Sequence, residues 1–141
     1  MIQDLHSHTY YSLCGKDTPD EVIETAIKNG VEFLAITDHC HGVVNSHPEL
    51  AWANNDARVF ISQIALRKYY DHIKTAAYKY RDYINVWCGI EVTTIDHGWN
   101  TVPDEGLDFS FFDFCFIENI EKTNSTIEDM FAFNERLGCK L

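Results

Sequence analysis

The sequence predicts an α/β fold built on a parallel sheet, and three observations lead to that prediction. Four strand-like segments alternate with helix-like segments along the 141 residues. A continuous apolar run of strand length at residues 33–36 is typical of a strand that is buried on both faces. The connection between the first two strands is short, so the helix between them is expected to lead to a parallel neighbour by a right-handed crossover.

The first three expected elements form one β-α-β unit. Residues 2–6 alternate between apolar and polar side chains, as a short strand does. Residues 18–21, Thr-Pro-Asp-Glu, combine an N-cap, a proline at the first helical position and a capping-box carboxylate, so a helix is expected to begin there. Asn29 and Gly30 are expected to end this helix, and residues 33–36 form the next strand.

The later elements continue the alternation. Residues 57–81 carry apolar side chains at helical spacing and predict one long helix. Residues 84–92 and 112–117 predict the third and fourth strands. A second capping box at residues 125–128 predicts a last helix. The face expected to be mostly apolar on this helix consists of Ile127, Met130, Phe131, Asn134 and Leu137.

Composition restricts the classes of protein to which the chain can belong. Its 11 Lys and Arg against 22 Asp and Glu give a net charge of -11, which argues against a broad nucleic-acid surface. An anionic substrate is still compatible, because bound cations reverse the local field. No run of 18 apolar residues is present, so no membrane span is expected. Five cysteines without a Cys-x-x-Cys pair favour a reduced, cytoplasmic protein.

Side chains that can bind metal follow the ends of three expected strands. His6 and His8 share one face of the first strand, Asp38 and His39 follow the second, and Glu91 ends the third. Because the carboxyl ends of parallel strands meet at one edge, we expect a single site there. Imidazole and carboxylate suit Zn, Mn or Fe. Taken singly, each motif has a simpler interpretation: a chance histidine pair, an aspartate that caps a turn, and a solvated glutamate.

Three segments of the chain resemble the first three motifs of the PHP (polymerase and histidinol phosphatase) superfamily: Asp4–Thr9 followed by Tyr11 and Ser12, Ala35–His39, and Gly89–Glu91. The resemblance extends over residues 2 to about 121. It implies a distorted (β/α)7 barrel, of which residues 1–141 are expected to form the N-terminal portion, with the first four or so β/α units. It also implies metal-dependent hydrolysis of phosphate esters at a site of two or three metal ions.

Carried over by position, the resemblance assigns His6, His8 and Glu91 to one metal ion. It also implies that Glu91 bridges to a second ion, which His39 binds. Asp38 is expected to orient a ligand rather than to bind metal. Asp38 and His39 are the residues that we expect to act in catalysis.

Two further ligands are expected where the chain departs from the family pattern. The family has an acid or a histidine about five or six residues after the second histidine of the first motif, where this chain has Leu13 and Cys14. Cys14 is either a thiolate ligand, which favours zinc, or a half-buried structural cysteine. The family's histidine near the end of the fourth strand is missing, and Glu118 or Glu121 is expected to replace it.

The expected function is hydrolysis of a small phosphomonoester, similar to histidinol phosphate, or of a nucleotide, by metal-activated water. No segment after residue 121 matches the late Asp-x-His pair of the family, so about half of the expected ligands are absent. The chain is therefore expected to hold one metal ion and to hydrolyse phosphomonoesters poorly. The alternative is a non-catalytic remnant that acts as a structural module and forms a homodimer. Amidohydrolases also begin with His-x-His, but the second and third motifs favour the PHP family.

Overall fold

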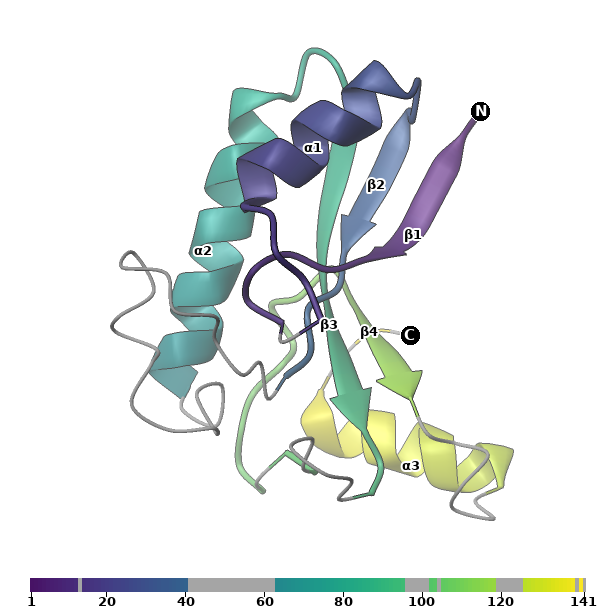
Figure 1. Ribbon diagram of the computed structural model, residues 1–141. Coiled ribbons are helices and arrows are strands. Elements are labelled where there is room, and N and C mark those ends of the chain that lie inside the picture. The colour runs from purple at the N-terminus through teal and green to yellow at the C-terminus, as the bar shows by residue number, and fades with distance from the viewer. Residues whose placement is uncertain are drawn as a thin grey trace.

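Four parallel strands and three helices make up the described part of the chain, which comprises residues 1–12, 14–40, 63–95, 102–103, 105–118, 126–138 and 140 of a computed structural model. The strands form one curled sheet in the order β1-β2-β3-β4 (Figure 1). This confirms the predicted α/β fold and agrees with the expected partial barrel. The elements in chain order are β1 (Gln3–Ser7), α1 (Pro19–Lys28), β2 (Phe33–Ile36), α2 (Gln63–Lys79), β3 (Asn85–Thr93), β4 (Phe114–Glu118) and α3 (Ile127–Leu137).

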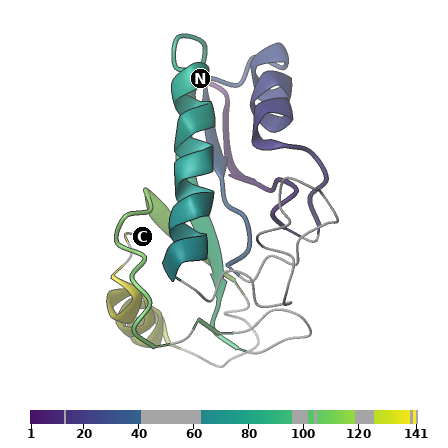
Figure 2. The ribbon, with the colours of Figure 1, turned by 90° about the vertical axis from the view of Figure 1, so that its left-hand side faces the viewer.

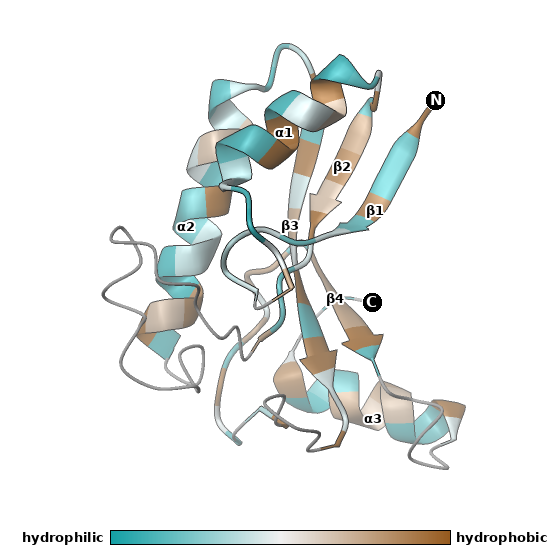
Figure 3. Ribbon diagram, in the orientation of Figure 1, coloured by the Kyte–Doolittle hydropathy of each residue, from teal (hydrophilic) through white to brown (hydrophobic). Residues whose placement is uncertain are grey.

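Helices α1 and α2 lie on the same side of the sheet, with α2 running along β3 (Figures 1 and 2). The hydrophobic core includes apolar side chains of β2, such as Leu34 and Ile36, and of α2, such as Ile73. Alternate residues of β3 also belong to this core: Val86, Cys88, Ile90 and Val92. The residues between them on β3 therefore point to the opposite face of the sheet. Figure 3 shows how apolar residues recur along β2 and β3.

The helix ends follow the capping chemistry of the sequence, with one shift. Thr18 caps α1 and forms the predicted capping box with Glu21. For α3 the predicted box is one residue early, because Thr126 has the extended conformation and its side chain accepts the amide hydrogen of Asp129. Residues 57–62 of the predicted long helix lie outside the described residues, and α2 is described from Gln63.

The apolar face predicted for α3 is only partly right. Asn134 and Leu137 are buried, but Ile127 and Phe131 are 64% and 60% exposed. The expected spacing is present, yet only the C-terminal half of the stripe is covered by the described part of the chain. Helical periodicity indicates which side chains share a face and not how far another element extends over that face.

The opposite face of the sheet is more open. Leu5 of β1 and Trp87 of β3 are exposed, and β1 is exposed at four of its five residues. No helix in the described part is long and apolar enough to cross a membrane. Cys115 is disulfide-bonded, contrary to the expectation that every cysteine is reduced, and its partner lies outside the described residues.

Candidate metal centre

His39 and Glu91 lie opposite each other because the pairing of the sheet continues past the end of β2. The amide of Glu91 donates to the carbonyl of Asp38 at 2.9 Å, and the amide of Cys40 donates to the carbonyl of Glu91 at 2.7 Å. These two hydrogen bonds flank His39, which forms an isolated parallel bridge with Glu91. Backbone hydrogen bonding thus brings the second and third motifs to one place.

A first group of ligands converges on one oxygen of Glu91. Nε2 of His6 lies 3.1 Å and Nε2 of His8 lies 2.8 Å from Oε2 of Glu91. The two ring nitrogens are 2.9 Å apart. The Glu91 side chain is 5% exposed, whereas that of His6 is 44% exposed. The group is therefore anchored inside the molecule and reaches solvent on the His6 side.

A second group uses the same carboxylate. Nδ1 of His39 lies 3.5 Å from Oε2 of Glu91 and 3.4 Å from Oε1 of Glu118. Glu118 reaches this position because β4 pairs in register with β3, so that Glu118 lies opposite Thr93. His39, Glu91 and Glu118 offer ligand atoms that all lie within 4.8 Å of one another.

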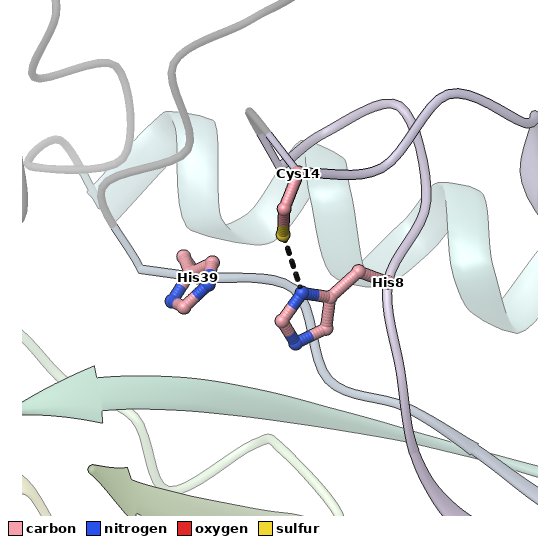
Figure 4. Close-up of side chains that lie close together, drawn as sticks. All are labelled: His8, Cys14 and His39. Carbon is pink, nitrogen blue, oxygen red and sulfur yellow. Dashed lines mark hydrogen bonds between the residues drawn. The ribbon is translucent and has the colours of Figure 1, made fainter.

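A third group contains Cys14. Its Sγ lies 2.8 Å from Nδ1 of His8, and these two residues together with His39 offer ligand atoms within 4.8 Å of one another (Figure 4). Cys14 is exposed rather than half-buried, and its sulfur is directed at a histidine of the site. All six residues that the sequence predicts as metal ligands are thus brought together, while Glu121 lies outside the described residues.

In the first group, His8 and Glu91 shift each other's pKa values. Burial alone would lower the pKa of His8, but the hydrogen bond with Glu91 and the surrounding carboxylates raise this pKa overall. Burial alone would raise the pKa of Glu91, but the hydrogen bond with His8 and the nearby imidazoles lower it overall. Each group thus favours the charged form of the other, and a cation bound there would compete with a proton for His8.

Asp38 is fully buried and is directed at the first motif rather than at the ligand groups. Its Oδ1 accepts the amide hydrogen of Thr9 and the hydroxyl hydrogen of Ser12, and its Oδ2 accepts the hydroxyl hydrogen of Thr9, each at 2.7 Å. The Ser12 hydroxyl also accepts the His39 amide hydrogen at 3.0 Å. Burial raises the pKa of Asp38 in spite of these hydrogen bonds. The geometry gives Asp38 a positioning role, because it links the loop after His8 to His39.

Tyr69 of α2 supports the same region, although the sequence pattern marks it only as an apolar position of a helix. Its hydroxyl accepts the amide hydrogen of Asp38 at 3.2 Å and donates to the carbonyl of Gly89 at 3.3 Å. The ring is fully buried, so this hydroxyl links β3 to the second motif within the core. Thr9 and Ser12 are likewise revealed as supporting residues only by their hydrogen bonds to Asp38.

The donor atoms of the first and second groups fit divalent cations. Imidazole nitrogen with carboxylate oxygen is a donor set that suits Zn, Mn and Fe. A carboxylate has lone pairs for more than one partner, whereas a neutral imidazole has one. Glu91 is the residue that the two groups have in common, so among the described residues it is placed to serve two cations at once.

Comparison with known proteins agrees with this arrangement at the level of the family. The family model described as PHP domain matches residues 4–134, which is nearly the whole chain. No curated protein and no solved structure matches the chain. The match includes His6, His8, His39, Glu91 and Glu118, on which the site is built. The chain belongs to the PHP domain family.

Proposed function

We propose that the chain is a metal-dependent phosphoesterase domain that would hold two divalent cations, with Glu91 as the shared ligand. This is one cation more than the sequence leads us to expect, because His39 and Glu118 form a second ligand group with the same carboxylate. The observation that carries this proposal is the convergence of imidazole nitrogens of His6, His8 and His39 within 3.5 Å of one oxygen of Glu91. A buried carboxylate with so many imidazole neighbours is costly unless protons or cations are shared among them. Family membership supports the same chemistry.

The number of ligands is compatible with catalysis. His6, His8 and Glu91 supply three protein ligands, and catalytic zinc sites typically have three protein ligands and an open position. The His6 side chain is 44% exposed, so solvent would reach a cation bound in this group. Cations bound here would supply an activated water near neutral pH and would neutralise the phosphoryl oxygens.

The residues of the chain have distinct roles in this proposal. His6 and His8 would hold one cation, His39 and Glu118 would hold the second, and Glu91 would contribute to both. Asp38 keeps the loop after His8 in place through its three hydrogen bonds. No basic surface is needed to attract the substrate, because the cations provide the positive charge in a chain of net charge -11.

The proposed substrate is a small phosphomonoester, similar to histidinol phosphate, or a nucleotide. The test is hydrolysis of p-nitrophenyl phosphate by the purified chain with and without added Mn²⁺ or Zn²⁺, compared with Glu91→Gln. We expect hydrolysis that requires metal and that falls to the buffer rate in Glu91→Gln. Metal-independent hydrolysis, or an equal rate in Glu91→Gln, would contradict the proposal.

A second candidate function is a non-catalytic metal-binding module that pairs with another copy of itself. The observation that favours it is the open face of the sheet, on which Leu5 and Trp87 are exposed. Metal binding without hydrolysis, together with a dimer in light scattering that Trp87→Lys converts to a monomer, would favour this second function. Hydrolysis by a monomer would exclude it.

A further inference from the structure

A hollow lies on the open face of the sheet, opposite the face that packs against α1 and α2. It has a volume of about 400 Å³ and is lined by Leu5, Trp87, Asp113, Phe114 and Lys140. Binding sites for small molecules typically have volumes of about 300–1,000 Å³, so the hollow has the size of a site for a ligand with one or two rings. We call it the aromatic hollow.

Aromatic rings form the wall of the aromatic hollow. Trp87 points away from the core, because the residues on either side of it on β3 belong to the core cluster. Its ring packs edge-to-face against Phe33, with centroids 4.8 Å apart, and lies 6.1 Å from the ring of Phe114. Trp87 is nevertheless 42% exposed, and Leu5 is 49% exposed. The neighbouring rings therefore hold the indole in place and leave part of it for another aromatic ring to contact.

Two charged residues complete the lining, and their surroundings leave a positive charge. Oδ2 of Asp113 accepts hydrogen bonds from Nζ of Lys74 at 3.0 Å and from the amide of Cys88 at 2.7 Å, so this carboxylate is already paired. Lys140 lies beside β4, because its carbonyl accepts the amide hydrogen of Cys115 at 2.7 Å. Since Asp113 and Lys74 neutralise each other, Lys140 gives the aromatic hollow one positive charge in a chain of net charge -11.

We propose that the aromatic hollow binds a small aromatic anion, such as an aryl carboxylate, with its ring against Trp87 and Phe114 and its charge toward Lys140. Charge favours this occupant over a second copy of the chain, which would bring a further net charge of -11 to the same face. Glu91 is four residues further along β3, which is about 13 Å at the rise of a strand. The site is therefore separate from the metal centre, and the inference does not rest on the proposed phosphoesterase function.

The first experiment compares three ligands that share a ring system and differ in charge: 2-naphthoate, 2-naphthylmethanol and 2-naphthylmethylamine. Their binding to the wild type is measured by equilibrium dialysis. We expect one 2-naphthoate per chain, the neutral alcohol to bind about threefold more weakly, and the cationic amine to bind at least about tenfold more weakly, because an exposed lysine contributes a modest attraction and an equal repulsion. Raising the salt concentration to about 1 M is expected to remove most of this difference, since exposed charges are then screened.

The second experiment repeats the dialysis with variants whose folding is checked by circular dichroism. Trp87→Ala is expected to bind all three ligands at least about tenfold more weakly, because the main ring contact is lost. Lys140→Gln is expected to weaken 2-naphthoate about threefold and to leave the alcohol unchanged. The matched controls are Phe131→Ala, which removes an exposed aromatic ring of α3, and Lys28→Gln, which removes a lysine of α1. Both controls are expected to bind as the wild type does.

The ligand series on the wild type decides the charge preference without any variant. Equal binding of the three ligands, or no binding of 2-naphthoate, would overturn the inference. Glu91→Gln is expected to keep 2-naphthoate, and its loss there would mean that the carboxylate binds at the metal centre, which overturns the aromatic hollow and leaves the proposed function standing. A dimer in light scattering that depends on Trp87 and forms without binding of 2-naphthoate would assign this face to a second copy instead.

Discussion

Replacing Asp38 tests whether one buried carboxylate holds the first and second motifs together. Asp38→Ala removes the acceptor of three hydrogen bonds, each 2.7 Å long, and leaves the Thr9 amide and the hydroxyls of Thr9 and Ser12 without that acceptor. Asp38→Asn keeps one carbonyl oxygen for the Thr9 amide and the Ser12 hydroxyl, and the Thr9 hydroxyl can turn to accept from the new amide. The pair of variants thus separates the hydrogen bonds from the shape of the side chain.

The magnitude follows from burial. Removing one partner of a buried, charge-assisted network typically costs about 3–5 kcal/mol in the free energy of unfolding. Burial raises the pKa of Asp38, so some desolvation cost is already present in the wild type and offsets part of this loss. We therefore expect about 3 kcal/mol for Asp38→Ala and about 1 kcal/mol for Asp38→Asn, which retains most of the hydrogen bonds.

The assay is urea unfolding followed by circular dichroism. Mn²⁺ binding is measured separately in buffer without urea, where each variant is folded. The expected result is a graded loss of stability, with metal affinity reduced in Asp38→Ala even where it is folded, because the loop that follows His8 is released. Equal stability of wild type and Asp38→Ala, with unchanged Mn²⁺ affinity, would refute the positioning role of Asp38.

Three further predictions concern the supports of the fold. Gly15→Ala is expected to lower metal affinity and stability together, because its Cβ cannot lie 1.9 Å from the carbonyl oxygen of Thr9; unchanged Mn²⁺ binding would contradict this. The pKa of Asp20 is lowered chiefly by the hydrogen bond that Lys79 donates to it. The Asp20–Lys79 pair therefore contributes to stability above pH 3.8, the ordinary pKa of an aspartate, and this contribution is lost as the pH falls further. Lys79→Met should therefore be less stable than wild type at pH 7 and equal to it in acid, and a pH-independent difference in urea midpoints would argue against the pair. Thr126→Ala is expected to cost about 1 kcal/mol by loss of the α3 N-cap, measured by thermal unfolding, and no change would show that this helix end contributes nothing to stability.

Most of the scaffold could be predicted because local chemistry determines it. The box of Thr18 and Glu21 begins α1 as expected, and the apolar run at residues 33–36 forms a buried strand. The start of α3 was predicted one residue early, because Ser125 and Thr126 are both good caps and only the backbone conformation decides between them. The exposure of Phe131 depends on what covers the helix, which no local pattern contains.

The ligand types of the site were predictable, but their grouping was not. The ends of parallel strands meet at one edge, so His8, His39 and Glu91 were expected to be close. The pairing that continues past β2 and sets His39 opposite Glu91 is a long-range backbone interaction with no sequence signal. The contact of Cys14 with His8 depends on the turn after β1, and the hydroxyl of Tyr69 reaches the site from a helix that appears only as core.

The central claim, that Glu91 is shared by two cations, is tested most directly by counting the Mn²⁺ ions bound per chain. Equilibrium dialysis followed by elemental analysis is done on the wild type, on Glu91→Gln and on Glu118→Gln, at matched protein concentration. We predict two Mn²⁺ ions for the wild type, loss of both in Glu91→Gln, and loss of only one in Glu118→Gln, because Glu118 belongs to a single ligand group. If Glu91→Gln loses no more Mn²⁺ than Glu118→Gln does, Glu91 is not the shared ligand and the account is contradicted.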